Sequence, residues 1–153
     1  ASDVYKRQGT DLAKTAKVEA SETRAPGAKR TYGVNNLTDG STTTYWATND
    51  GTKHATLTFT WDSAQALRYV SLMELVAKGQ RVKKFKLEVS QDGTNFRPVA
   101  ENIKQTTIGY KRIIPLNGST SNSYSGQGIQ AKALRVTIED AKACPLLKSV
   151  AIY

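Results

Sequence analysis

The chain has 153 residues, with 22 Lys and Arg against 13 Asp and Glu, which gives a formal net charge of +9 and a pI of about 9.7. This length is sufficient for one domain with a hydrophobic core and excludes two large domains. No apolar run is long enough to span a membrane, and the basic residues are scattered, so we expect a monomer that binds neither membranes nor nucleic acid.

Residues 1–10 carry no recognisable pattern and are assigned to a linker or to non-native sequence, so the predicted domain is 11–153. No basic-then-apolar signal segment opens the chain. We therefore expect that a leader has been removed or that the chain is a piece of a longer protein. A short irregular piece after Asp11 precedes a predicted edge strand from Lys17 to Ala20.

The most informative segment is Leu37 to Asp50, which reads L-T-D-G-S-T-T-T-Y-W-A-T-N-D. Asp39-Gly40 predicts a tight turn, because Gly accepts a positive φ and Asp bonds to its own following backbone. An acid, hydroxyl oxygens and a turning glycine could hold a hard cation, or could form a loop that satisfies itself without an ion. Tyr45-Trp46 is an aromatic pair in a polar loop. Such a pair indicates either a plug for one end of a core or a platform for a ligand.

Alternation of apolar and polar residues predicts most of the remaining chain as strands. Ala55 to Trp61 has one apolar face, and Leu67 to Val76 is apolar on both faces, as expected of a central covered strand. Val82 to Gln91 leads into a hairpin signal at Asp92-Gly93, with a return strand from Phe96. Further predicted elements are strands at Ile108 to Leu116, Ala133 to Glu139 and Leu146 to Tyr153, and a polar surface loop at Asn117 to Gly128.

No segment has sustained helical periodicity. About eight short strands with turn signals between them predict an all-β fold, an antiparallel jelly-roll β-sandwich. Such folds gather long loops at the ends of the sandwich. Three loops carry polar groups suited to binding: Tyr45 to Asp50, Glu74 to Arg81 and Gly109 to Arg112. If these loops share one end, they form a rim of an aromatic ring, acids, amides and guanidiniums.

The sequence does not support catalysis. Cys144 is the single cysteine and His54 the single histidine, so no intrachain disulfide can form. We interpret Cys144 as a small buried thiol in an apolar context and His54 as an exposed residue at the start of a strand. Glycoside hydrolysis needs two carboxylates across a cleft, and no such pair stands out. The chain is therefore predicted not to be an enzyme.

The chain carries two informative motifs: Leu37-Thr38-Asp39-Gly40 followed by Thr44-Tyr45-Trp46, and Ser90-Gln91-Asp92-Gly93-Thr94-Asn95-Phe96. They resemble motifs of the discoidin family, the galactose-binding-like jelly roll also found at the C-termini of coagulation factors. The resemblance runs from about Asp11 to the last residue. Four further segments resemble the module appended to bacterial α-L-fucosidases of glycoside hydrolase family 29: Tyr45-Trp46-Ala47-Thr48, Gly79-Gln80-Arg81-Val82, Ile108-Gly109-Tyr110-Lys111-Arg112 and Ala141-Lys142-Ala143-Cys144-Pro145-Leu146.

The resemblance implies a non-catalytic module, close to the family 32 carbohydrate-binding modules, cut from an exported glycan-degrading enzyme. The implied partners are a galactosyl or fucosyl glycan and the catalytic domain of the parent glycosidase. The implied location is secreted, periplasmic or on the cell surface of a bacterium. The alternative is a structural module that packs on the catalytic domain and binds no glycan of its own.

The resemblance also suggests one cofactor, a structural calcium ion held by Asp39 and Thr44. Members of the family often use the Asp of the turn, the Thr before the aromatic pair, backbone oxygens nearby and an acid shortly before the C-terminus. Here position 41 is Ser where an acid is common, and the terminal acid would fall at Ser149. Because ligand charge tunes calcium affinity, we expect that affinity to be reduced. The alternative is that Asp39 accepts hydrogen bonds within its own loop and that Thr44 packs beside it.

Sugars are bound by an aromatic face and by planar polar groups that bond vicinal hydroxyls. The predicted ligand-binding set is Trp46, Asp50, Glu74, Gln80, Arg81, Tyr110 and Arg112. Each has a structural alternative. Trp46 could plug the end of the sandwich, Glu74 and Arg81 could pair across the base of their loop, and Tyr110 and Arg112 could dock on a neighbouring domain.

Overall fold

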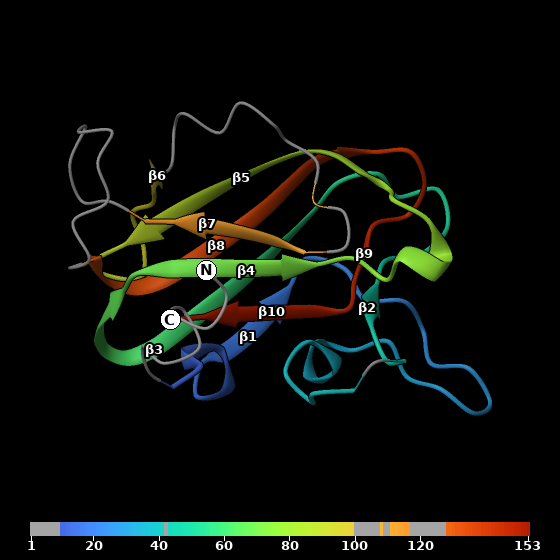
Figure 1. The fold of residues 1–153 in the computed structure, drawn as a ribbon, viewed down its shortest axis with the longest axis horizontal. Helices are drawn as coiled ribbons and strands as arrows, with labels where there is room; N and C mark the ends of the chain where they lie inside the picture. The colour runs from blue at the N-terminus through green and yellow to red at the C-terminus, as the bar shows by residue number, and fades with distance from the viewer. Residues whose placement is uncertain (1–9, 42, 100–107, 109–110, 117–127) are drawn as a thin grey trace.

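The computed structural model describes residues 10–41, 43–99, 108, 111–116 and 128–153. In this part of the chain, ten strands are accompanied by three short 3₁₀ turns. All strand pairings are antiparallel. The predicted all-β fold is confirmed, and the arrangement is that of the jelly-roll β-sandwich (Figure 1).

The larger sheet contains five strands in the order β1–β3–β8–β5–β6. They are Lys17–Ala20 (β1), Ala55–Leu67 (β3), Ile129–Ala141 (β8), Val82–Ser90 (β5) and Arg97–Val99 (β6). Alternate side chains of the three central strands point to one side. Leu57 of β3 and Leu87 of β5 both lie opposite Val136 of β8, and all three are fully buried. The period-two apolar pattern therefore builds one continuous buried face.

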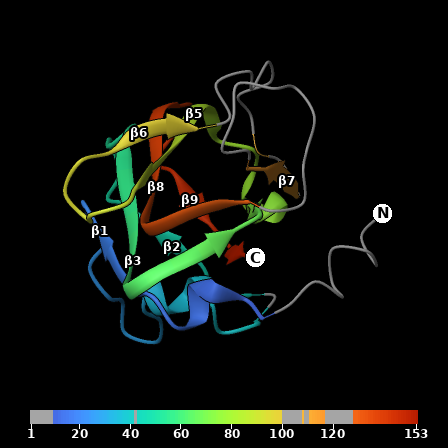
Figure 2. The same cartoon turned by 90° about the vertical axis from the view of Figure 1, so that its left-hand side faces the viewer.

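The smaller sheet contains Ser149–Ile152 (β10), Tyr69–Met73 (β4) and Arg112–Pro115 (β7), in that order. Figure 2 shows the sandwich from one end, with β1, β3 and β8 in one layer and β7 in the other. At the far end, Trp46–Ala47 (β2) pairs with Leu146–Leu147 (β9) as a separate two-stranded ribbon. This ribbon closes the sandwich at the end where long loops gather.

The 3₁₀ turns are Leu12–Lys14 (η1), Val34–Leu37 (η2) and Val76–Lys78 (η3). Asp11 fixes the first of them to the last strand, because its Oδ1 accepts hydrogen bonds from the backbone N–H groups of Ala13 and Ile152, each at 2.9 Å. Among the described residues, no helix has the length and apolarity that crossing a bilayer requires.

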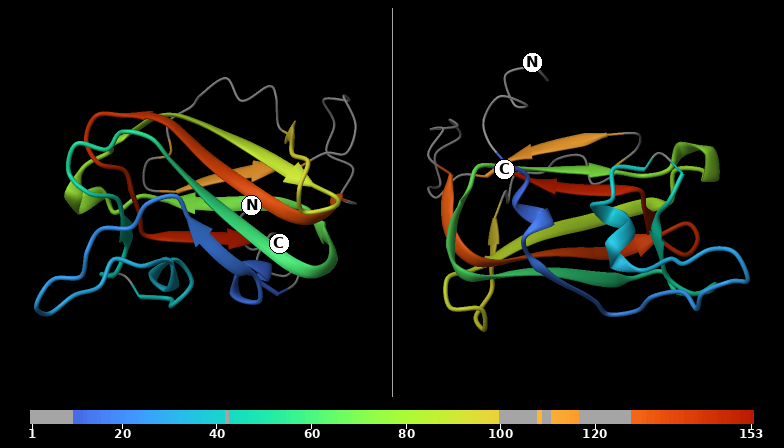
Figure 3. Two further views of the ribbon diagram at one scale, coloured as in Figure 1. Left: turned by 180° about the vertical axis from the view of Figure 1, so that it is seen from behind. Right: turned by 90° about the horizontal axis from the view of Figure 1, so that it is seen from below.

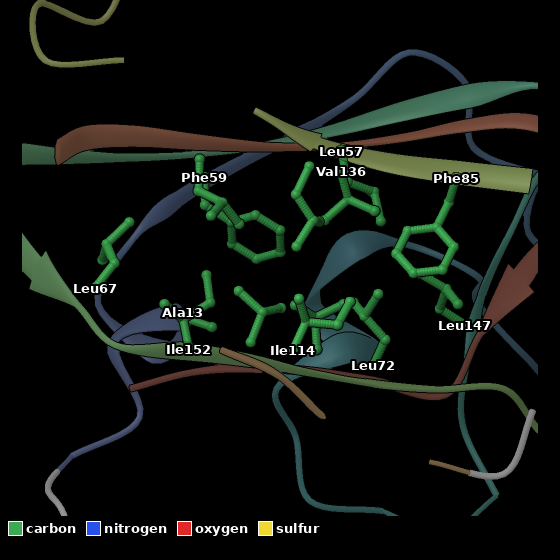
Figure 4. Packing of buried hydrophobic residues seen from close by; sticks show 14 of the residues in the cluster. Ala13, Leu57, Phe59, Leu67, Leu72, Phe85, Ile114, Val136, Leu147 and Ile152 are labelled. Carbon is green, nitrogen blue, oxygen red and sulfur yellow. The ribbon is translucent and has the colours of Figure 1, made fainter. Parts of the chain in front are cut away.

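The core lies between the two sheets. Figure 4 shows Phe59, Val136 and Phe85 reaching from the larger sheet toward Leu72, Ile114 and Ile152 of the smaller one. These residues are between 0% and 4% exposed. Each fully buried aliphatic or aromatic side chain contributes about 1.5–3 kcal/mol to folding, so the rigid frame for the loops comes from this layer.

Several strand boundaries differ from the sequence prediction. β4 ends at Met73 and not at Val76, because the chain turns through η3 and places Glu74 in the interior. The predicted final strand is divided at Lys148, whose backbone N–H donates to Met73 O at 2.8 Å, and its halves join different sheets. β8 begins at Ile129, earlier than predicted, and β7 covers only Arg112–Pro115. The predicted linker, apart from Thr10, and the predicted 117–128 loop, apart from Gly128, lie outside the described residues.

Candidate binding site at the loop end

Four loops meet at the end of the sandwich that carries β2 and β9, and we call this region the loop end. It comprises residues 21–33, 48–54, 74–81 and 142–145 (Figure 3). Backbone hydrogen bonds join the loops. Arg24 N donates to Ala47 O at 2.7 Å, Thr48 N to Pro145 O at 3.2 Å, and Lys142 N to Arg81 O at 2.7 Å. The loop end is thus held as one surface.

Four side chains form a polar cluster on this surface, which we call the arginine cluster: Arg24, Asp50, Arg81 and Cys144. Arg24 Nη2 donates to Asp50 Oδ1 and lies 3.2 Å from Cys144 Sγ. Arg81 Nη1 lies 3.0 Å from the same sulfur atom and donates to Cys144 O at 3.0 Å. Two guanidinium groups from different loops therefore converge on one thiol.

The opposite charges of Arg24 and Asp50 each stabilise the ionised form of the other group. The hydrogen bond and the positive charge of Arg24 lower the pKa of Asp50, and the hydrogen bond to Asp50 raises the pKa of Arg24. Both groups are therefore ionised at neutral pH. The Asp50 side chain is 88% exposed and that of Arg24 is 28% exposed, so the carboxylate faces solvent from a fixed position. A fixed carboxylate beside guanidinium groups is suited to bonding hydroxyls or anionic oxygens.

Two tyrosines border the arginine cluster. The rings of Tyr32 and Tyr45 lie 5.4 Å apart with an angle of 48° between their planes. The guanidinium carbon of Arg24 lies 5.9 Å from the Tyr32 ring centre, and that of Arg30 lies 5.6 Å from the Tyr45 ring centre. Tyr45 is buried, whereas Tyr32 is half-buried and offers part of its ring at the surface.

Trp46 is a correction to the predicted ligand-binding set. Its side chain has 0% exposure, and its Nε1 donates to Glu22 O at 3.1 Å. A ring in this position presents no face to a sugar. The structure therefore agrees with the alternative in which Trp46 plugs one end of the core.

Glu74 is a second correction, because it is 1% exposed and faces the interior. Its Oε1 accepts hydrogen bonds from the backbone N–H groups of Arg81 and Val82, each at 2.9 Å. Glu74 thus closes the base of its loop. It positions Arg81 through the backbone, while the Arg81 guanidinium is held by Lys78 O and by Cys144.

The other residues of the predicted ligand-binding set do not all lie at the loop end. Gln80 is exposed beside Arg81 in its loop. Arg112 lies on β7, with its guanidinium carbon 5.9 Å from the centre of the Phe85 ring. Tyr110 lies outside the described residues. Of the three loops predicted to share one end, the structure brings together those containing Asp50 and Arg81.

Sequence reasoning missed three members of this surface: Arg24, Arg30 and Tyr32. They occupy a loop whose only signals are Pro and Gly, and no periodicity shows which residue it faces. Cys144 is buried, as predicted, at 6% exposure, but its sulfur contacts guanidinium groups as well as apolar neighbours. His54 is exposed just before β3, as predicted.

The loop predicted to hold calcium is satisfied by its own hydrogen bonds. Asp39 Oδ1 accepts from Ser41 N at 2.9 Å, and Asp39 Oδ2 accepts from Thr44 Oγ1 at 2.6 Å. Ser41 Oγ accepts from Thr44 N at 3.3 Å. Gly40 has φ 73°, which fits the predicted turn.

This donor set does not fit a calcium ion. It contains one carboxylate, and both of its oxygens already accept local hydrogen bonds. Calcium prefers six to eight oxygen ligands with several negative charges. We therefore assign no role to an ion at Asp39 and Thr44.

A concavity lies away from the loop end, on the outer face of the smaller sheet. We call it the outer hollow; its volume is about 230 Å³, and its lining includes Met73, Ile113, Tyr69, Tyr153, Lys14 and Lys111. The rings of Tyr69 and Tyr153 stack at 4.9 Å. Burial, with a contribution from Asp11, raises the pKa of Tyr153, so its phenol is neutral at physiological pH. The hollow is mainly apolar, unlike the loop end.

A two-layer antiparallel jelly roll with a polar rim of loops defines a discoidin-type module. The family model of the F5/8 type C domain matches residues 17–147, and the chain belongs to this family. The resemblance to discoidin domains is therefore confirmed. Modules of this type are typically non-catalytic.

The similar proteins include enzymes and binding modules. The chain is 26% identical over 143 residues to a protein of Oryza sativa subsp. japonica named as an α-L-fucosidase, covering 94% of this chain and 25% of that protein. The crystal structure of a protein of Bacteroides thetaiotaomicron, also named as an α-L-fucosidase, has a TM-score of 0.78 at 30% identity, covering 94% of this chain and 28% of the other.

The crystal structure of a single module also matches. Chitosan-binding module 1 from a chitosanase/glucanase of a Paenibacillus species has a TM-score of 0.72 at 24% identity, covering 95% of this chain and 99% of that module. This similarity shows the fold alone. The chain spans about a quarter of the length of the fucosidase relatives and nearly the whole of that single module.

Proposed function

We propose that this chain is the carbohydrate-binding module of a glycan-degrading enzyme, an α-L-fucosidase, and that it binds galactose- or fucose-containing glycans through the loop end. The observation that carries the proposal is the arginine cluster. Asp50 and two guanidinium groups are held in fixed positions at the exposed end of a discoidin-type fold, beside the partly exposed ring of Tyr32. The membership in the F5/8 type C family and the similarity to proteins named as α-L-fucosidases support it.

The proposed role is to tether the catalytic domain of the parent glycosidase to its substrate. The parent would be secreted, periplasmic or displayed on the cell surface, where such glycans occur. Binding at a single shallow site would be weak, with a dissociation constant on the order of millimolar to high micromolar and a free energy of about 4–6 kcal/mol. Weak single-site binding is sufficient when several modules or repeated ligand units act together.

A glycan array probed with the chain in multivalent form tests this proposal. We expect binding to galactosyl or fucosyl structures, and weaker binding in an Arg81→Gln variant. Lys17→Gln is the matched control, because it removes one positive charge from an exposed strand residue outside the loop end. A blank array under conditions where millimolar affinity is visible through avidity would contradict the proposal.

A second candidate function is a structural module that packs on the catalytic domain and binds no glycan. The outer hollow favours it, because Met73, Ile113, Ala151 and Tyr153 are all partly exposed on one sheet face. Apolar faces of this kind often mark contacts between domains. The chain covers only about a quarter of the length of the fucosidase relatives. This is consistent with a catalytic domain beside it in a longer protein.

Met73 supplies a direct test of the packing alternative, because it is the single methionine of the chain and lines the outer hollow. Peroxide converts an accessible methionine to the sulfoxide, which mass spectrometry detects as one added oxygen. If the packing alternative is correct, Met73 oxidises readily in the isolated chain and is protected in the parent polypeptide. Equal oxidation rates in the two would refute docking on this face.

A further inference from the structure

The loop end carries a strong excess of positive charge. Its four loops contain seven basic residues, Arg24, Lys29, Arg30, Lys53, Lys78, Arg81 and Lys142, and three acidic residues, Glu22, Asp50 and Glu74. Five of the seven basic residues are exposed, and Arg24 and Arg81 are half-buried. Within the described residues, Arg24 is the single one of the seven that forms an ion pair.

The three acids are already engaged by the protein. Glu22 Oε2 accepts a hydrogen bond from Asn49 N at 3.0 Å, and a hydrogen bond from the Thr52 side chain is the main cause of its lowered pKa. Glu74 is buried and bonded to two backbone N–H groups. Asp50 is paired with Arg24. The remaining positive charge of the loop end is therefore open to a ligand from outside.

The two cluster arginines are positioned before any ligand arrives. Arg81 is held at Nε by Lys78 O at 3.3 Å and at Nη1 by Cys144 O at 3.0 Å, which fixes the plane of its guanidinium. No hydrogen bond of its Nη2 is found among the described residues. Arg24 is fixed by Asp50 and by the Tyr32 ring. A planar guanidinium with free N–H groups is the side chain best matched to a carboxylate or sulfate.

We propose that the loop end selects acidic glycans, in which a carboxylate or a sulfate ester of the sugar chain is bound by Arg81 and Arg24. This inference rests on the proposed glycan-binding function and specifies its substrate class. The exposed lysines around the cluster raise the local concentration of such ligands, because clustered charge of one sign steers an opposite charge to the surface. A neutral galactosyl or fucosyl glycan is bound through its hydroxyls at the same cluster and lacks this charge contribution.

Isothermal titration with three matched oligosaccharides tests the inference. All three share one galactosyl or fucosyl core. The first is neutral, the second carries one sulfate ester, and the third carries one carboxylate. We expect both acidic members to bind about tenfold more tightly than the neutral one at about 0.1 M salt. The preference disappears at about 1 M salt, where the Debye length falls from about 10 Å to about 3 Å. Unequal gains for the two acidic members tell a sulfate-selective site from a carboxylate-selective site, and either supports the inference.

Single substitutions test which residues cause the preference for acidic ligands. Arg81→Gln and Arg24→Gln should remove the preference for acidic ligands, and Arg81→Lys should keep only part of it because lysine lacks the guanidinium fork. Lys142→Gln, at an exposed position, should reduce the preference without threatening the fold. Lys17→Gln, the control outside the loop end, should leave the preference intact.

The outcomes separate the inference from the proposed function. Equal affinity for neutral and acidic members overturns the inference and leaves glycan binding in place. Failure of all three members to bind overturns the proposed function. Poly-glutamate serves as a probe for charge alone, and binding as tight as that of the acidic oligosaccharides would also overturn the inference.

Discussion

Replacing Trp46 by Phe separates the two roles that its sequence position permits. The structure places the indole in the core with 0% exposure and a 3.1 Å hydrogen bond from Nε1 to Glu22 O. Phe removes that hydrogen bond, at about 1–2 kcal/mol, and leaves part of the ring volume empty, at about 1–2 kcal/mol more. The free energy of unfolding should therefore fall by about 2–4 kcal/mol.

Thermal unfolding followed by circular dichroism measures this effect. A change of 1 kcal/mol shifts the melting temperature of a domain of this size by about 2–4 °C, so we expect a decrease of about 4–16 °C. Glycan affinity, measured below the transition, should stay within about twofold of the unmodified chain, because the ring contacts no ligand. Tyr32→Phe is the matched aromatic control and should lower the melting temperature by less than Trp46→Phe does. An unchanged melting temperature together with lost glycan binding would refute the placement of Trp46 in the core.

Three further predictions concern a glycine, a turn and calcium. Gly128→Ala should destabilise the fold by about 1–3 kcal/mol or more, because φ is +75° and the new Cβ would lie 2.3 Å from Leu67 O. Gly33→Ala, with φ −76° and nothing within 4 Å, is its control and should be close to neutral in urea unfolding. Backbone hydrogen bonds from Asn95 and Thr94 lower the pKa of Asp92. The ionised Asp92 side chain therefore stabilises the folded state fully above the pKa of the unfolded state, near 3.9. This stabilisation is lost as the pH falls further. Asp92→Asn should thus flatten the acid limb of a plot of melting temperature against pH, and an unchanged limb would contradict this assignment. Calcium or EDTA should leave the melting temperature unchanged, because both oxygens of Asp39 are occupied. A rise of several degrees with calcium would show that the Asp39 loop opens to bind the ion.

The fold could be predicted from the sequence because one-sided burial imposes a period of two on the strands. Lys17–Ala20 was predicted with both of its boundaries, and the centre of β5 follows the alternation of Phe85, Leu87 and Val89. Periodicity failed where a strand changes sheet. The last strand divides at Lys148, and nothing in an apolar run shows which sheet each half joins.

The candidate site could be predicted only in part. Asp50 and Arg81 lie at one end, as the hypothesis of a shared rim requires, because both contact Cys144. Their contact with a ligand stays a prediction. Trp46 and Glu74 have the chemistry of ligand-binding residues, but the structure buries both, since packing and backbone hydrogen bonding use the same groups. Arg24 comes from a loop far away in sequence, and its contact with Asp50 depends on how two loops fold back on each other.

The central claim is that the loop end, and not the outer hollow, binds an acidic glycan. Titration of the ¹⁵N-labelled chain with a sulfated or carboxylated galactosyl or fucosyl oligosaccharide, followed by amide chemical shifts, tests it most directly. We expect the largest shifts at Arg24, Asp50, Arg81 and Cys144, and their loss in the Arg81→Gln variant. Shifts confined to the strands around Met73 and Ile113 would contradict the account, and would place the ligand on the outer face of the smaller sheet.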